Sequence, residues 1–198
     1  MKIDNLTNST QIYTSNVFFL RGDWNTLDDV NTLIDVGRDP SVIEKIKDIN
    51  TGVGKQKVQR VILTHNHYDH TSLLPLVIEN FNPAVYSFSS NVPGVDQLVQ
   101  DGDTFKIGDS QVEVLHTPYH TTDSICLYCP EESCIFTGDT PLIFDQLPST
   151  SNRKFFQALK KISNKDIQTI YPGHGKPQNR NVAQKISETL DKIENKKA

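Results

Sequence analysis

The sequence predicts a mixed α/β fold in which helices cover β-sheets. Two observations carry this expectation. Short apolar segments typical of strands alternate with amphipathic segments of helical period, and neighbouring strand segments are separated by little more than turn residues. Hydrophobic residues make up 36% of the 198 residues, which is enough for a sizeable core. Neither a linker nor a low-complexity segment interrupts the pattern, so we expect one domain over residues 1–198.

The N-terminal half is expected to alternate strands with helices. We expect strands over residues 11–20, 31–36, 57–63 and 83–88, and helices over residues 41–49 and 69–81. The first helix has its apolar stripe at Val42, Ile43, Ile46 and Ile49. The run Val61-Ile62-Leu63 is typical of a buried strand, and it leads the chain directly into a group of histidines.

The C-terminal half continues with strands over residues 111–115, 124–129, 134–137 and 167–171, and helices over residues 152–162 and 181–193. It also contains the three cysteines, Cys126, Cys129 and Cys134. Neither a fourth cysteine nor a histidine stands at a usable distance for a zinc knuckle. We therefore expect structural thiols, and their odd number fits a reducing compartment.

The most informative pattern is a set of histidines and aspartates typical of a metal site. The segment from Thr64 to His70 reads Thr-His-Asn-His-Tyr-Asp-His, and three further candidates follow it along the chain. Neutral imidazoles and carboxylates are the ligands that hold zinc, iron or manganese in proteins. The candidate ligands are His65, His67, Asp69, His70, His120, Asp139 and His174. They are too many for one tetrahedral ion, so we expect two divalent ions, with Zn²⁺ preferred and iron or manganese as alternatives.

The position of these residues supports a site rather than scattered surface histidines. A lone histidine is usually exposed or satisfied in a core, but three imidazoles and a carboxylate in one short segment repel on protonation unless a cation organises them. Each candidate also stands at an expected strand end or in the turn after one. Strand ends can direct several side chains into one cavity while the sheets hold the backbone.

Three segments of the chain together resemble the metallo-β-lactamase superfamily. They are the histidine cluster, the segment Thr32-Leu33-Ile34-Asp35-Val36-Gly37, which is similar to the family's "LIDTG", and His116-Thr117-Pro118-Tyr119-His120-Thr121, which is similar to its "HTPGHT". The resemblance implies a four-layered αββα sandwich. It also implies that His65, His67 and His120 hold one ion, that Asp69, His70 and His174 hold the other, and that Asp139 bridges them. Tyr119 replaces the usual glycine, and His116 is expected to have a supporting role rather than to bind metal.

The implied chemistry is hydrolysis through a metal-bridging hydroxide. Two ions about 3.5–4 Å apart share a water and lower its pKa so that hydroxide is present at neutral pH. Asp69 is the expected catalytic residue, because it can orient this nucleophile and later accept its proton. We expect a small-molecule substrate with an ester, thioester or lactone bond.

Single positions distinguish the branches of the family. Asp139 stands where β-lactamases with a mixed zinc site have cysteine, and His67 stands where flavodiiron proteins have an acidic residue. The short interval between Asp139 and His174 leaves no room for the accessory domain of the related nucleases. A glyoxalase II-like hydrolase is therefore expected. Residues 141–145 and the pair Asp23-Trp24 are expected either to shape its pocket or only to pack as loops.

Three other functions stay open at this stage. The first is an oxidoreductase like the persulfide dioxygenases, which share the fold but use one iron. The second is a phosphodiesterase, because the same hydroxide attacks phosphorus. The third is a binding module without catalysis, which the full ligand set disfavours.

Charge and hydropathy exclude other classes of function. The net charge of -4 and the pI near 5.8 argue against a nucleic-acid partner, because a duplex binder needs a concentrated basic face. No apolar run reaches the roughly 18 residues of a membrane span. The segment after Met1 lacks the apolar stretch of a signal peptide, so a cytoplasmic protein is expected. The sequence leaves the oligomeric state open.

Overall fold

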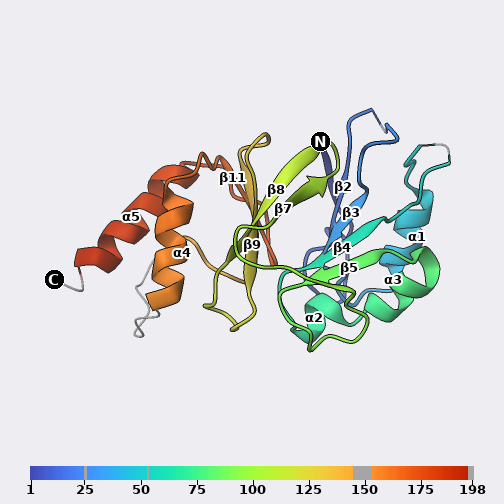
Figure 1. Ribbon diagram of the computed structural model, residues 1–198, viewed down its shortest axis with the longest axis horizontal. Helices are drawn as coiled ribbons and strands as arrows, with labels where there is room; N and C mark the ends of the chain where they lie inside the picture. Colours follow the sequence, from blue (N-terminus) through green and yellow to red (C-terminus); the bar gives the residue numbers. More distant parts are fainter. Residues whose placement is uncertain (25, 53, 145–152, 196–198) are drawn as a thin grey trace.

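The computed structural model describes residues 1–24, 26–52, 54–144 and 153–195, and it contains two β-sheets between two layers of helices (Figure 1). The first sheet contains β1 (Lys2–Asn5), β2 (Phe18–Arg21), β3 (Thr32–Ile34), β4 (Arg60–Leu63), β5 (Ala84–Ser87) and β6 (Gln97–Leu98). The second contains β7 (Thr104–Ile107), β8 (Ser110–His116), β9 (Ile125–Cys129), β10 (Cys134–Gly138) and β11 (Thr169–Pro172). The helices are α1 (Ser41–Asp48), α2 (Tyr68–Thr71), α3 (Leu74–Phe81), α4 (Arg153–Ser163) and α5 (Val182–Asn195).

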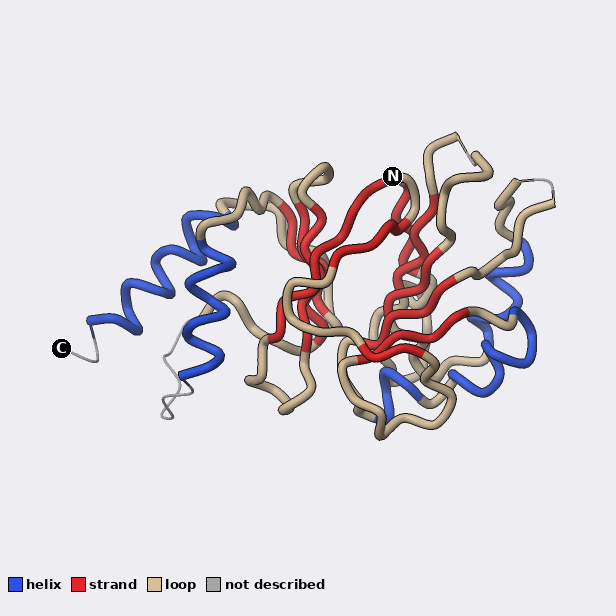
Figure 2. Tube along the Cα trace, viewed as in Figure 1, coloured by secondary structure: helices blue, strands red, loops and turns tan. Residues whose placement is uncertain are grey.

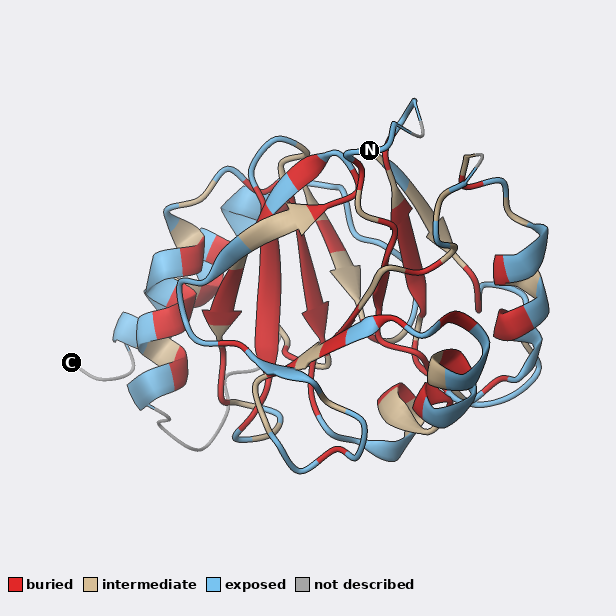
Figure 3. Ribbon diagram, turned by 45° about the vertical axis from the view of Figure 1, so that its right-hand side comes forward, coloured by how far each residue is buried: buried red, intermediate tan, exposed pale blue. Residues whose placement is uncertain are grey.

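The expected four-layered αββα sandwich is confirmed. Helices α1 and α3 lie on the outer side of the first sheet, and α4 and α5 lie on the outer side of the second, so both sheets are covered (Figure 2). Successive residues of a strand point to opposite faces. In β4, Val61 and Leu63 therefore pack toward α1 and α3, whereas Ile62 packs between the sheets. Figure 3 shows the buried side of each outer helix turned toward its sheet.

Strand direction brings the ends of several strands to one edge of the sandwich. In the first sheet β3, β4, β5 and β6 run parallel, and β1 and β2 continue it antiparallel. In the second sheet β10 pairs antiparallel with β9 but parallel with β11. Parallel neighbours end at the same edge, so β3 delivers Asp35 beside the residues after β4, and β10 delivers Asp139 beside the residues after β11.

Some expected elements differ from the structure. The helix expected over residues 69–81 is two helices, α2 and α3, because Pro75 lacks an amide donor and fits only in the first turn of a helix. The strand expected over residues 11–20 is limited to β2, since the backbone of Ser15 and Asn16 bonds to loops at the sheet edge instead. Strands β1, β6 and β7 were not expected. The first residue of the helix expected over 152–162 lies outside the described residues.

The three cysteines are buried and free. Cys126 packs beneath α4 and α5, whereas Cys129 and Cys134 face each other across β9 and β10 in the core between the sheets. Burial raises the pKa of the Cys126 thiol to about 12, so it packs as a neutral side chain. In the described part of the chain, no helix has the length and apolar character needed to cross a bilayer.

Candidate metal centre

The structure brings all seven candidate ligands together at one edge of the two sheets. They come from the segment after β4, the first turn of α2, the loop between β8 and β9, and the ends of β10 and β11. Their ligand atoms form three groups, each with all atoms within 4.8 Å of one another: His65, His67 and His120; His65, His70 and Asp139; and Asp69, His70 and His174. The shared members make the three groups one continuous cluster.

Backbone hydrogen bonds join the segments that carry these residues. The amide of Ile125, at the start of β9, donates to the Thr64 carbonyl at 2.9 Å and so connects the two sheets next to His65. The amide of Gly173 donates to the Gly138 carbonyl at 2.7 Å, which places the loops of Asp139 and His174 side by side. The edge is therefore held by its backbone as well as by its side chains.

Asp35 is the residue that fixes the inner part of the cluster, and its role was missed from the sequence. One carboxylate oxygen accepts a hydrogen bond from the Thr64 amide at 2.8 Å. The other accepts from the Thr64 hydroxyl at 2.8 Å and lies 2.7 Å from Nδ1 of His70. Asp35 is buried, and its φ of 55° is in the left-handed region. The signals in the sequence were an acidic residue directly after an apolar strand and its place in the segment similar to "LIDTG", neither of which was given a role.

The same contacts determine the charge state of the buried groups. Burial opposes the charge of His70, but Asp35 and Asp139 outweigh it and raise the pKa of His70 to about 10. Burial and the neighbouring His70 lower the pKa of His65 to about 4. For Asp139, burial disfavours the carboxylate, but the contact with His70 dominates and lowers its pKa to about 2. At neutral pH the metal-free cluster thus holds a neutral His65, a protonated His70 and the Asp139 carboxylate side by side.

Several buried ligand atoms have no hydrogen-bond partner among the described residues. They are Nε2 of His65, His70 and His174, and Oδ1 of Asp139. Some lie at ion-pair distance without hydrogen-bond geometry: His70 Nε2 is 3.2 Å from Asp139 Oδ1, and His174 Nε2 is 3.1 Å from Asp69 Oδ2. Buried polar atoms are normally paired, so unpaired atoms that converge need an explanation. Divalent cations would satisfy all of them at once, and the donor set therefore fits metal ions.

The outer ligands are held more loosely. The side chains of His120 and His174 are each 33% exposed. Nε2 of His120 lies 2.9 Å from Nδ1 of His67, and both His120 and His174 lie 3.5 Å from Oδ2 of Asp139. Asp139 is thus at the centre of the cluster, with contacts to the inner His70 and to both outer histidines.

Two glycines are required where the loops cross. A Cβ on Gly173 would collide with the Asp139 carboxylate and lie 2.8 Å from Cε1 of His70. Gly138 has a φ of +49°, and a Cβ there would collide with the side chain of Thr64. Only glycine permits these close approaches of the backbone to neighbouring side chains.

Residues 11–17 close one side of the site. The Asn16 side chain donates to the carbonyls of Pro172 at 2.8 Å and Gly175 at 2.9 Å, on either side of His174. The ring of Tyr13 stacks on that of His174 with 5.3 Å between centroids. Neither role was predicted, because the segment read as a strand.

The segment around His120 has its own supports. The ring of Tyr119 packs against Phe155, with centroids 4.5 Å apart, and against Phe144 at 5.5 Å. His116 lies outside the three ligand groups, stacks on Phe88 at 4.0 Å, and has Nε2 2.9 Å from the Thr122 carbonyl. The structure thus gives His116 the expected supporting position.

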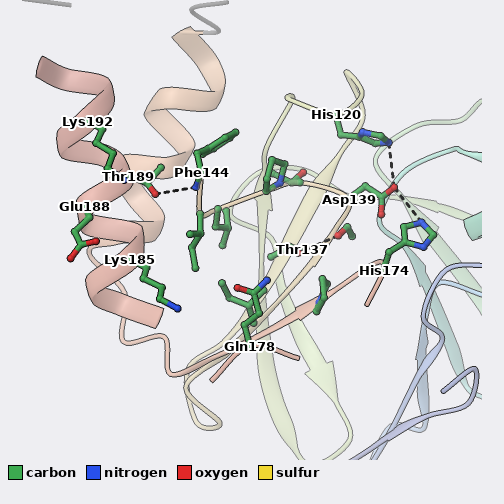
Figure 4. A pocket seen from close by; sticks show the side chains of 17 residues that line it. His120, Thr137, Asp139, Phe144, His174, Gln178, Lys185, Glu188, Thr189 and Lys192 are labelled. Atoms are coloured by element: carbon green, nitrogen blue, oxygen red, sulfur yellow. Dashed lines mark hydrogen bonds and ion pairs between the residues drawn. The ribbon is translucent and has the colours of Figure 1, made fainter. Parts of the chain in front are cut away.

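A cavity of about 670 Å³ opens beside the cluster (Figure 4). His120, Asp139 and His174 line one end, and α5 lines the other. Residues 141–144 form part of its wall, which agrees with the expectation that this segment shapes the pocket rather than only packing as a loop. Asp145, the last residue of that segment, lies outside the described residues. Asp23 and Trp24 are not among the lining residues, and Trp24 is exposed.

Comparison with known proteins identifies similar chains. The family model described as "Metallo-beta-lactamase superfamily" matches residues 12–93 and 88–174. An atrochrysone carboxyl ACP thioesterase of Aspergillus fumigatus is 31% identical over 165 residues, which are 81% of this chain and 51% of that protein. A probable hydroxyacylglutathione hydrolase of Schizosaccharomyces pombe is 37% identical over 113 residues, 56% of this chain and 44% of that protein. The chain thus spans about half the length of these curated relatives.

Solved structures share the fold at low sequence identity. ETHE1 from Myxococcus xanthus has a TM-score of 0.65 and 21% identity, with 100% of this chain and 92% of that chain covered. The BLEG-1 B3 metallo-beta-lactamase has a TM-score of 0.63 and 22% identity, with 89% and 91% covered. At these identities the likeness shows the architecture alone.

Proposed function

This chain belongs to the metallo-beta-lactamase superfamily, and from that premise we propose that it is a metal-dependent hydrolase of thioesters, with esters and lactones as further substrates. The observation that carries the proposal is the convergence of buried ligand atoms without hydrogen-bond partners, on His65, His70, His174 and Asp139. The names of the similar curated proteins, a thioesterase and a hydroxyacylglutathione hydrolase, support the choice of a thioester.

We propose that His65, His67 and His120 hold one ion and that Asp69, His70 and His174 hold the other. Two of the three ligand groups have this composition. The third group contains Asp139 with one histidine from each set, which supports a bridging position for this carboxylate. Histidine and aspartate ligands suit zinc best, and iron or manganese would also fit.

Bound divalent ions would supply hydroxide at neutral pH and stabilise the negative charge that develops on the substrate oxygen. The chain itself supplies orientation and proton transfer. Asp69, which lies 3.1 Å from His174, is placed to orient the attacking oxygen and to take its proton. Asp35 keeps Nε2 of His70 directed into the site through its contact with Nδ1.

The two sheets act together in this proposal. Each set of three ligands draws two residues from the first sheet's edge and one from the second's, so we propose that the described residues function as one domain. The free, buried cysteines support a reducing and therefore cytoplasmic location.

Metal analysis of protein purified without chelators tests the proposal. We expect two divalent ions per chain and hydrolysis of a simple acyl thioester that stops with EDTA and returns with zinc. Asp139→Ala is expected to lower kcat/KM by about a thousandfold or more, because this carboxylate contacts His120 of one ligand set and His70 and His174 of the other. One iron per chain with oxygen consumption, or unchanged turnover in Asp139→Ala, would contradict the hydrolase.

A further inference from the structure

The cavity beside the metal centre is polar at both ends. The far end, on α5 and the segment after β11, carries Lys185 and Gln178. Figure 4 shows Lys185 extending from α5 toward the side of the cavity where Gln178 lies. The backbone of Gln178 is held, because its main-chain N–H and carbonyl both pair with Ile170 of β11 at 2.9 Å. Lys192 and Glu188 of α5 also line this end, which therefore presents two lysines, one carboxylate and one side-chain amide.

Lys185 has no counter-ion within the described ranges. Its side chain takes part in no ion pair or hydrogen bond with another described residue. Glu188, one turn along the helix, also lines the cavity, but its carboxylate accepts a hydrogen bond from Gln184 at 2.8 Å and forms no ion pair with Lys185 among the described residues. Exposed lysines are often solvated without consequence, but this one faces a cavity next to the proposed reaction centre.

The helix face that carries Lys185 is turned toward the cavity wall. Thr189, one turn further along α5, is buried and accepts a hydrogen bond from the Phe144 amide at 3.2 Å. This contact fixes the distance between α5 and the apolar wall formed by Leu142, Ile143 and Phe144. The cavity thus has an apolar middle between its two polar ends.

We propose that this cavity binds the part of the substrate remote from the scissile bond, and that this part carries a carboxylate or phosphate recognised by Lys185 and Gln178. The inference rests on the proposed hydrolase function and specifies its substrate class. A cavity of about 670 Å³ is larger than a short acyl group needs and is within the size range of small-molecule sites. Lysine supplies a charged donor, and the glutamine side-chain amide adds a second donor from a backbone held against β11.

Two matched pairs of thioesters test the inference and show which side of the scissile bond carries the anion. The first pair has the charge on the thiol, as acetyl esters of 3-mercaptopropionate and of its uncharged amide. The second has it on the acyl group, as methyl thioesters of glutarate and glutaramate. We expect one anionic member to have a KM about tenfold below that of its amide, as a charge-assisted hydrogen bond would give.

Variants then assign this preference to the cavity. Lys185→Gln is expected to abolish the preference while kcat for the neutral substrates stays within about twofold, because the variant leaves the metal ligands in place. Gln178→Leu should reduce it by a smaller factor. Lys47→Gln makes the same charge change on α1, outside the cavity, and should keep the preference.

A binding measurement separates this inference from the proposed function. Thioether analogues that cannot be hydrolysed, with and without the carboxylate, are titrated calorimetrically into the wild type and Lys185→Gln. Tighter binding of the anionic analogue that depends on Lys185 supports the cavity site, whether or not any thioester is hydrolysed. Absence of thioester hydrolysis would refute only the proposed hydrolase function. Equal affinity of the two analogues, or a preference that survives Lys185→Gln, overturns the inference whatever the activity.

Discussion

The inner and outer ligands of the candidate metal centre are held in different ways. His65 and His70 are buried, and each has a hydrogen-bonded partner that fixes its ring, Thr64 and Asp35 respectively. His120 and His174 are one-third exposed and are supported by ring contacts and by other ligands. The inner part is therefore preorganised by the fold. The outer part needs an ion to fix its geometry, and variants of the two parts should differ accordingly.

The largest difference is expected from Asp35→Asn. The two carboxylate oxygens accept from the Thr64 amide, the Thr64 hydroxyl and Nδ1 of His70. Asparagine has one accepting oxygen and an NH2 donor, so at least one of these buried donors loses its partner and His70 is held less firmly. We expect metal affinity to fall by about 10- to 100-fold and the free energy of unfolding to fall by about 1–3 kcal/mol. Competition with a chromogenic chelator and urea unfolding measure the two effects.

Asp39→Asn is the matched control for Asp35→Asn. Asp39 is also a buried carboxylate, but it accepts from the Ser41 amide at the start of α1. It should lower stability with little change in metal affinity. If Asp39→Asn lowered metal affinity as much as Asp35→Asn, the loss would follow from general destabilisation. It would then not support an inner part held in place by the Asp35 contacts.

The inner part also predicts a pH dependence for the metal-free protein. The pKa of His70 is raised to about 10 in the folded state, mainly by Asp35 acting against burial, whereas an unfolded histidine titrates near 6.5. Its contribution to stability is complete below pH 6.5 and is lost as pH rises toward 10. Between pH 6.5 and 8 the free energy of unfolding should fall with a slope that rises from about half of its limiting value to nearly the full value of about 1.4 kcal/mol per pH unit.

Three other groups with strongly shifted pKa titrate mainly outside this interval. The pKa of His65 is lowered to about 4 by burial and by His70, so its effect appears below pH 6.5. The amino terminus and Cys126 titrate above the chosen range. Urea unfolding of the metal-free protein measures the slope, and Asp35→Asn should reduce it. A slope that does not depend on Asp35 would assign it to another group.

A smaller effect is expected from Tyr119→Gly, in the outer part. The substitution removes the ring contacts with Phe144 and Phe155 and frees the backbone next to His120. We expect kcat/KM to fall by about tenfold, since misplacement of one ligand by a fraction of an ångström is costly. Tyr119→Phe keeps the ring and should stay within about twofold. Saturating zinc should restore much of the Tyr119→Gly activity but none of that lost in Asp139→Ala.

The smallest effect is expected from Tyr13→Ala. The ring of Tyr13 stacks on His174 but is itself 71% exposed, so it restrains this ligand only weakly. We expect a two- to fivefold decrease in affinity for the second ion, at the level of an exposed ring contact. Stepwise metal titration measures it. A loss as large as that of Asp35→Asn would mean that the outer ligands depend on the fold as strongly as the inner ones.

The sequence predicted the layers and the ligand candidates well because both follow from local patterns. The alternation in β9, where Ile125 and Leu127 face one core and Cys126 the other, is a two-residue period within one segment. The cluster from His65 to His70 is also local, and the resemblance to a family supplied the order of the later ligands.

Long-range contacts could not be predicted in the same way. Asp35 acts through Thr64 and His70, which are distant in sequence, and no single-sequence pattern reports a contact between them. The segment of Tyr13 and Asn16 has strand composition, but it pairs with no strand in the described part of the chain. The backbone amides of Ser15 and Asn16 donate instead to the carbonyls of Asp69 in α2 and of Gly173 next to His174. Gln97–Leu98 of β6 is too short to give a periodic signal.

The distribution of ligands between the sheets has a mechanical consequence. Each set of three ligands contains residues from both halves of the sandwich. An ion bound to either set would therefore cross-link the edges of the two sheets. Removal of the metal by a chelator would then weaken the packing of one sheet against the other, as reduction of a disulfide between them would. The concentration of free metal would then affect the stability of the folded chain as well as its catalytic rate.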